Sequence, residues 1–151
     1  MIARKPLGIE VSNTSRMIVP PVQPDADDLK DWAAGTAVAV GAMIEVAGRR
    51  YWCTVAGTTG SAAPTHTDGD AADGTATWRW IRPVRSRVWI VNDSSVVIYL
   101  AFVSPAVANA GIRLNAAGGA FNSPENWACP RGGVWAIGAS AGSNNLTIQE
   151  G

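Results

Sequence analysis

The apolar residues of this chain occur in short runs that never repeat with the period of an α-helix. Nearly every run is bounded by Gly, Asn, Ser or Pro, which favour turns. Residues that favour long helices are scarce, and Lys5 and Lys30 are the only lysines. The pattern predicts an all-β protein, built from short strands joined by tight turns.

The length and charge of the chain exclude several classes of protein. A chain of 151 residues allows one domain, or two very small ones. Its 12 basic and 12 acidic residues balance, which argues against a nucleic-acid partner. No apolar segment reaches the roughly 18 residues of a membrane-spanning helix. Residues 1–10 lack the apolar core of a signal peptide, so we expect neither a membrane partner nor secretion by a host.

Residues 1–31 are predicted to form an extended N-terminal arm. The prolines within residues 20–24 enforce extended backbone. Ile9–Val11 and Met17–Val19 have the composition of short strands, and the acidic run Asp25–Asp31 could start one helical turn. The alternation of apolar and polar residues favours an arm that docks on a neighbouring surface, in its own chain or another, over a flexible tail.

Residues 32–83 are predicted to form a small Trp-rich β module. Arg49–Val55 and Thr75–Ile81 alternate like strands, with Tyr51 and Cys53 on one face of the first. The polar segment Ala56–Gly74 between them is predicted to be a loop that ends in an Asp-Gly turn. A module of this size has few other large apolar residues, so its tryptophans must supply much of the core.

Residues 84–151 are predicted to form a β-sandwich or jelly-roll-like domain. The run Val96–Val103 reads as one long strand buried on both faces. Asn115–Pro124 is predicted to be a glycine-rich loop, and Val134–Gly138 and Leu146–Gln149 are predicted to be short strands.

The residues that carry most enzyme chemistry are too few to form a recognisable site. His66 is the only histidine, it lies in a predicted exposed loop, and no nucleophile motif accompanies it. Together with Cys53 and Cys129 it cannot make a four-ligand zinc site. The acids of Asp68–Gly74 depart from the spacing of a calcium loop, and Asp73 is better explained by its turn. We expect no enzyme activity, catalytic residue, metal or cofactor; the cysteines are expected to be reduced, although the sequence leaves a disulfide open.

Five aromatic residues of the small module are candidates for binding a glycan or a protein partner: Trp32, Tyr51, Trp52, Trp78 and Trp80. Flat aromatic faces can stack on pyranose rings. The alternative is that these side chains form the core of a module that has no other. Because Tyr51 and Trp52 are adjacent on a strand, they point to opposite faces, which allows one of them to be exposed.

The only basic run of the chain holds four arginines and no acid: Arg79, Arg82, Arg85 and Arg87. With tryptophans nearby, such a run could bind phosphates and stack bases. The neutral charge of the whole chain favours a protein interface instead, where arginine is enriched and pairs with carboxylates.

Two stretches resemble proteins of tailed phages. Trp32 to Ile81 has an opening Trp, then "V…G…Y", "GTTG…P" and a closing "DGTATW". This pattern resembles a small module repeated across many tailed-phage structural proteins, and residues 32–82 resemble, more loosely, the chitin-binding modules of bacterial chitinases. The stretch RVWIVNDSSVVIYLAF, followed by GIRL, GGVWAIGAS and LTIQE, resembles a pattern common in small phage head or tail proteins.

The resemblance implies a structural virion protein rather than a particular place in the virion. The first expectation is a capsid decoration (cement) protein that binds across subunits of the major capsid protein, at the capsid surface, after synthesis in the bacterial host cytoplasm. The alternative is a tail- or fibre-associated module that binds host surface glycan through exposed aromatics. A homo-oligomer is expected, and a trimer would suit a site of local threefold symmetry.

Overall fold

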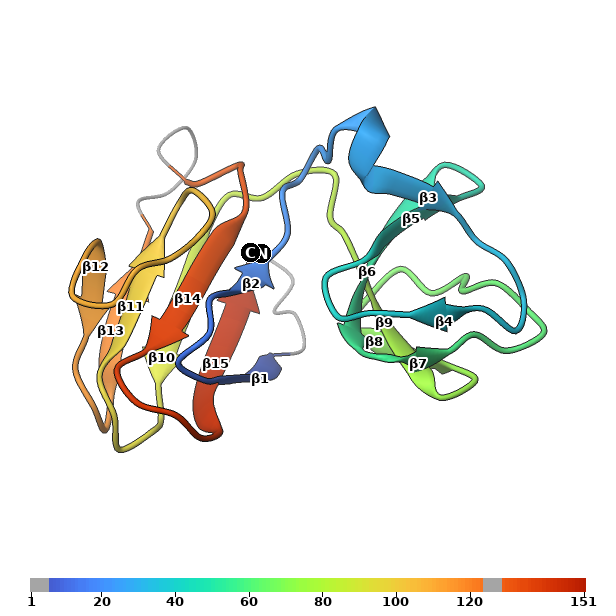
Figure 1. Cartoon of the computed structure of the whole chain (residues 1–151). Coiled ribbons are helices and arrows are strands. Elements are labelled where there is room, and N and C mark those ends of the chain that lie inside the picture. Colours follow the sequence, from blue (N-terminus) through green and yellow to red (C-terminus); the bar gives the residue numbers. More distant parts are fainter. Residues whose placement is uncertain (1–5, 124–128) are drawn as a thin grey trace. The chain divides into compact units, whose positions relative to one another are not determined.

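Nearly all regular structure of this chain is β, which confirms the predicted all-β class (Figure 1). The computed structural model describes residues 6–123 and 129–151. In these residues the only helical element is the 3-10 turn η1 (Ala26–Asp28), within the acidic run for which one helical turn was predicted. Residues 1–5, where the predicted arm begins, and Pro124, where the predicted glycine-rich loop ends, lie outside the described residues.

The chain folds into two compact units. Of the described residues, 6–22, 84–123 and 129–151 form the first unit, and 23–83 form the second. The second unit is therefore an insertion in the sequence of the first. Its last residue, Pro83, is where the small module was predicted to end, but it begins earlier than the predicted Trp32.

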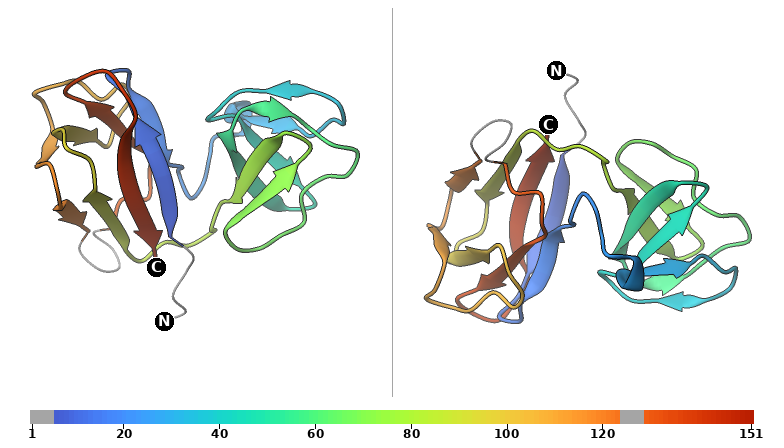
Figure 2. Two further views of the ribbon diagram at one scale, coloured as in Figure 1. Left: turned by 90° about the horizontal axis from the view of Figure 1, so that it is seen from below. Right: turned by 90° about the horizontal axis from the view of Figure 1, so that it is seen from above.

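The first unit contains two four-stranded antiparallel sheets, with the strand orders β1-β15-β10-β13 and β12-β11-β14-β2. The strands are β1 (Leu7–Val11), β2 (Arg16–Val19), β10 (Val88–Asn92), β11 (Ile98–Ala101), β12 (Ile112–Leu114), β13 (Gly119–Asn122), β14 (Val134–Gly138) and β15 (Asn144–Glu150). In chain order, the first strand pairs with the last, the second with the last but one, β10 with β13, and β11 with β12. Figure 2 shows the two ends of this nested pattern, β1 and β15, side by side.

Alternation along the strands explains why one face of each sheet is buried. In β1, Leu7, Ile9 and Val11 are buried while the residues between them are exposed. Ile9 lies opposite Leu146 of β15, which is also buried. A slip of one residue would turn this apolar row to solvent, so the burial fixes the register.

The predicted N-terminal arm is not a separate segment of the structure. Described residues 6–22 belong to the first unit, where β1 and β2 are edge strands of its two sheets, and residues 23–31 belong to the second unit. The expected docking therefore takes place on the chain's own sheets. The reason is that the apolar residues of each strand, and the backbone donors and acceptors along one of its edges, find partners there.

Three strand predictions differ from the structure. β11 is shorter than the predicted strand Val96–Val103, and Phe102 beyond its end is exposed. β13 lies inside the predicted glycine-rich loop. β8 (Asp70–Asp73) lies inside the predicted polar loop. The two-residue strand β7 (Gly57–Thr58) also lies inside that loop. These three missed strands are held by backbone bonds to β10, β9 (Ala76–Trp80) and β4 (Ala37–Val38), and such pairing leaves little trace in the side-chain pattern.

A buried arginine joins distant segments of the first unit. Arg85 is 3% exposed, and its Nε donates a hydrogen bond to Glu150 Oε1 at 2.6 Å. Its Nη1 donates to Pro130 O at 2.7 Å, and its Nη2 donates to Pro20 O. Carboxylate and carbonyl oxygens thus offset the cost of burying the charge. The same contacts hold the chain beyond β2 next to the chain before β10, so the two ends of the insertion meet here.

We predict that Arg85→Ala lowers the free energy of unfolding by about 3–5 kcal/mol, because it leaves the Glu150 carboxylate buried without its partner. Urea denaturation followed by circular dichroism measures the loss. Arg113→Ala is the matched control, since Arg113 is exposed on β12, and it should change stability by less than about 0.5 kcal/mol. Equal denaturation midpoints for the two variants would contradict a structural role for Arg85.

The second unit contains a five-stranded sheet with the order β3-β5-β6-β9-β8 and a two-stranded sheet of β4 and β7. Its remaining strands are β3 (Leu29–Asp31), β4 (Ala37–Val38), β5 (Met43–Val46), β6 (Arg49–Val55), β7 (Gly57–Thr58) and β9 (Ala76–Trp80). β3 and β5 run parallel, and the other pairs are antiparallel. The core cluster is Ile44, Tyr51, Cys53 and Trp78, so Tyr51 and Cys53 share a face as their alternation predicts.

The β8–β9 hairpin turns at Gly74, where the Asp-Gly turn was predicted. Gly74 has a φ of +65°, a left-handed conformation that L side chains rarely adopt. A Cβ at this position would also collide with the Thr58 carbonyl. The turn leaves Asp73 at the end of β8, facing the tryptophans of the module.

Candidate functional site

The carboxylate of Asp73 organises the second unit. Asp73 is 5% exposed, and its Oδ2 accepts hydrogen bonds from Trp32 Nε1 at 2.8 Å and from Trp78 Nε1 at 3.0 Å. Its Oδ1 accepts a hydrogen bond from the Gly60 amide at 2.6 Å. Charge-assisted bonds of this kind are stronger than neutral ones. One side chain therefore fixes the position of both indole rings and of the chain at Gly60.

Thr59 closes the same region from the neighbouring segment. Its hydroxyl donates to Ala33 O at 2.6 Å and accepts from the Thr36 amide at 2.8 Å. The Thr59 amide in turn donates to Thr36 O at 2.9 Å. These bonds hold the segment 33–36 in an ordered turn beside Trp32.

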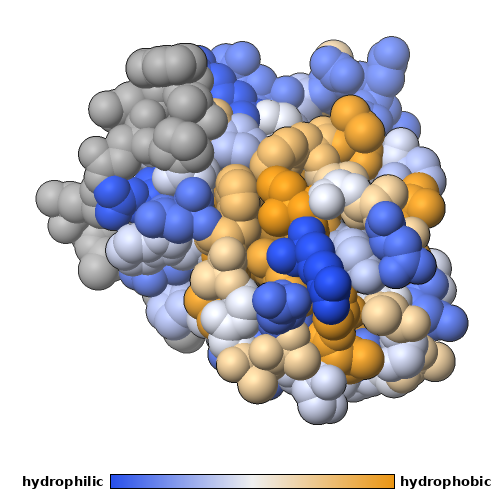
Figure 3. All heavy atoms as spheres, turned by 90° about the vertical axis from the view of Figure 1, so that its left-hand side faces the viewer, coloured by the Kyte–Doolittle hydropathy of each residue, from blue (hydrophilic) through white to orange (hydrophobic). Residues whose placement is uncertain are grey.

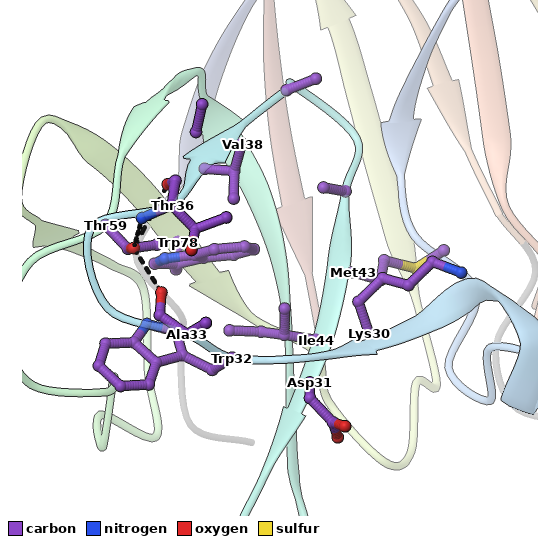
Figure 4. A pocket seen from close by; sticks show the side chains of 13 residues that line it. Lys30, Asp31, Trp32, Ala33, Thr36, Val38, Met43, Ile44, Thr59 and Trp78 are labelled. Atoms are coloured by element: carbon purple, nitrogen blue, oxygen red, sulfur yellow. Dashed lines mark hydrogen bonds between the residues drawn. The ribbon is translucent and has the colours of Figure 1, made fainter.

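A pocket of about 230 Å³ lies in the second unit beside these residues. Figure 4 shows Trp32 at one end, Met43 and Lys30 at the other, and Ile44 between them. The lining residues come from β3, β4, β5 and β9 and from segments next to β3, β4, β5 and β7: Lys30, Asp31, Trp32, Ala33, Thr36, Ala37, Val38, Ala39, Ala42, Met43, Ile44, Thr59 and Trp78. The wall is mainly apolar, and the opposite charges of Lys30 and Asp31 lie at its rim, pointing outward (Figure 4). Such a surface suits a small ligand with an apolar face and polar edges.

The structure separates the five candidate aromatic residues. Trp32 and Trp78 line the pocket, but Trp78 has no exposed surface and Trp32 is half-buried. Tyr51 and Trp52 are buried and do not line it, and Trp80 is half-buried and packs on the core cluster. The alternative reading, in which these aromatics form the core, therefore holds for most of them. Trp32 alone combines partial exposure with a place in the pocket.

The four candidate arginines have different surroundings rather than one common surface. Arg79 is buried and pairs with Asp70 at 3.2 Å, and Arg85 is buried against Glu150. The guanidinium carbon of Arg87 lies 5.0 Å from the ring centre of Trp89. Arg79 and Arg85 thus form ion pairs within the chain, and the interface role of the four arginines stays a prediction. Arg82 and Arg87 are half-buried.

The other chemistry-bearing residues also have internal roles. The His66 ring packs against Tyr51 with 5.0 Å between ring centres, so His66 is half-buried rather than exposed as expected. Within the described residues, no three His, Cys, Asp or Glu side chains gather as metal ligands. Cys53 and Cys129 are buried free thiols. None of the helical structure in the described chain is long enough to span a membrane.

Sequence reasoning missed several residues that form the pocket or hold it in shape. Asp73, which orients Trp32, was interpreted as a turn residue only, and Thr59, Lys30 and Asp31 were not considered as site residues. The closing pattern "DGTATW" holds the one available signal, because it places Asp73 five residues before Trp78 across a hairpin turn. The bond from Trp32 to Asp73 spans 41 residues and leaves no local signal.

We predict that Asp73→Asn lowers the free energy of unfolding by about 1–3 kcal/mol. An amide has one acceptor oxygen where the carboxylate has two, so at least one of the indole or amide donors loses its partner. Urea denaturation measures the loss, and the indole N–H signals of Trp32 and Trp78 should shift in the NMR spectrum. Asp28→Asn is the control, because Asp28 is exposed. If the two variants were equally stable, Asp73 would not organise the module.

We also predict that the protein loses stability in alkaline solution. Burial raises the pKa of the Cys53 thiol above 9.0 and the pKa of the Tyr51 phenol above 10.0. Above the usual thiol pKa the unfolded chain releases a proton that the folded chain keeps, so the free energy of unfolding falls as pH rises. Urea denaturation over a neutral-to-alkaline pH series measures the slope. Cys53→Ala should make it shallower above pH 9.0, and an unchanged slope would refute the contribution of Cys53.

The comparisons with known proteins add no assignment. No protein-family model matches the chain, and no curated protein is similar enough to be matched.

Proposed function

We propose that this chain is a structural protein of a tailed-phage virion that decorates and stabilises the capsid by binding across subunits of the major capsid protein. The phage origin rests on the two sequence patterns described above. The structural observation that carries the proposal is an ordered, exposed apolar patch on the first unit. A decoration protein needs such a surface, because it acts by burying area on its neighbours rather than by chemistry.

The patch lies at the connection between β11 and β12. Phe102, Val103 and Val107 are 44%, 72% and 57% exposed, and the Phe102 ring lies 5.7 Å from that of Phe121 on β13. Figure 3 looks onto the side of the first unit where β12 and β13 lie, and apolar side chains gather there. Apolar patches on soluble proteins mark contacts with other molecules.

Two hydrogen bonds hold this exposed connection in place. The Ala106 amide donates to Ser15 Oγ at 2.8 Å, and the Tyr99 hydroxyl donates to Asn109 Oδ1 at 2.7 Å. A connection held in this way loses less conformational entropy when it binds than a mobile one would. This order supports a binding role for its apolar residues.

The strand order of the first unit is compatible with the same proposal. Nested pairing of eight strands in two sheets is the order of a jelly roll, a fold found in viral capsid and lectin domains. We therefore propose the jelly roll as the finer description of this unit. Fold alone does not assign function, so this observation supports the proposal without carrying it.

The proposal includes the location and partners of the protein. It is synthesised in the host cytoplasm, resides at the capsid surface, and forms a homo-oligomer, with a trimer favoured at sites of local threefold symmetry. Each 100 Å² of apolar surface buried contributes roughly 2.5 kcal/mol before the costs of association, so many copies can fasten a shell. Nucleic acid, membrane and catalysis have no part in it.

We predict that the protein binds phage heads that lack it, and that Phe102→Ser weakens this binding at least about tenfold. Co-sedimentation over a range of protein concentrations measures affinity and stoichiometry, and light scattering of the free protein measures its oligomeric state. The matched control is Val55→Ser, because Val55 is exposed on the second unit. Thermal unfolding of both variants separates lost binding from lost folding. A wild-type protein that stays in the supernatant would refute capsid decoration.

The pocket of the second unit favours a second candidate function, a tail- or fibre-associated protein that binds host surface glycan. This candidate predicts co-sedimentation with tails, or with host polysaccharide, in place of heads. The same experiment with tails as the target therefore separates the two candidates.

A further inference from the structure

We infer that the pocket beside Trp32 is a binding site for a single neutral pyranose ring. The site belongs to the second unit alone, since every residue that lines it lies between residues 30 and 78. It deepens the second candidate function by naming the ligand and the position of the site. It does not depend on whether the protein sits on heads or on tails.

The size of the pocket sets the size of the ligand. Pockets for drug-sized molecules enclose about 300–1,000 Å³. This pocket encloses about 230 Å³ and therefore fits one ring rather than an extended oligosaccharide. A longer glycan would place one residue in the pocket and leave the rest in solvent.

The wall of the pocket offers apolar contact in a fixed geometry. Trp32 is half-buried, and the bond from its Nε1 to Asp73 holds the indole in one position. Val38, Ala42 and Met43 are partly exposed and complete the accessible apolar surface. A pyranose presents a face of C–H groups, which carry partial positive charge and are attracted to the negative face of an aromatic ring. Because the indole is already fixed, binding orders few side chains and costs little entropy.

The polar groups at the pocket select an uncharged ligand. Asp31 is exposed, and its carboxylate lies at the rim and points away from the cavity (Figure 4). The carboxylate has no hydrogen-bond or ionic partner among the described residues, so it can accept bonds from sugar hydroxyls that project out of the pocket. Lys30 Nζ donates to Asp27 O at 3.3 Å and retains two further donors. The two charges cancel, so an anionic sugar gains from Lys30 but is repelled by Asp31. A neutral hexose or N-acetylhexosamine satisfies both groups through its hydroxyls.

The test is NMR titration of the full-length protein with methyl glycosides of glucose, galactose, N-acetylglucosamine and glucuronic acid. We expect at least one neutral glycoside to shift the Trp32 indole N–H signal saturably, with a Kd of about 1 mM as befits a single ring. Glucuronic acid should bind at least about fivefold more weakly. If no neutral glycoside gives saturable shifts, or if the glucuronide binds as tightly, the inference is wrong.

Two variants with matched controls test the position of the site. Ala37→Leu fills the pocket, whereas Ala34→Leu adds the same bulk to an exposed residue that does not line it. Asp31→Ala removes the acceptor, whereas Asp28→Ala removes an exposed carboxylate that does not line the pocket. Binding should weaken about tenfold in the first member of each pair and stay unchanged in the second. Equal effects within either pair would overturn the assignment.

The pyranose site and the capsid proposal can be tested separately. Because the apolar patch lies on the first unit, Ala37→Leu and Asp31→Ala should bind heads as the wild type does. Sugar binding without head binding would refute decoration alone, and head binding without sugar binding would refute only the pyranose site.

Discussion

The second unit depends on one buried carboxylate. Asp73 accepts hydrogen bonds from two indoles and a backbone amide, and these donors come from three separate segments of the chain. A module of about sixty residues buries little apolar surface, so a few strong polar bonds matter more in it than they would in a larger domain. The same bonds orient Trp32 at the pocket. Stability of the module and the shape of its pocket therefore share one cause.

Arg85 has the corresponding role in the first unit. It is buried against Glu150 of the last strand and reaches the carbonyls of Pro20 and Pro130. The first unit can thus close around an insertion of sixty-one residues, 23–83, because the two ends of that insertion are held together. In each unit a charged side chain is used for architecture, and the surfaces left for partners are apolar or mixed.

The two proposed surfaces lie on different units and have different chemistry. The patch around Phe102 is broad, exposed and apolar, as a contact with another protein requires. The pocket beside Trp32 is small and apolar, with opposite charges at its rim, which suits a small ring that has polar groups at its edge. Under the two proposals, the first unit attaches the protein to a particle and the second unit contacts a glycan.

The sequence by itself determined the class of the fold and the positions of most strands. Short alternating runs bounded by turn residues specify β structure locally, and the Asp-Gly turn at Gly74 is a local steric requirement. Only the tertiary structure decided where the N-terminal segment packs and that β8 and β13 are strands. Backbone pairing with other strands fixes all three. The candidate site followed the same division. Composition pointed to the aromatics, but which of them stayed accessible depended on bonds across the fold, such as that between Trp32 and Asp73, and no local pattern encodes those.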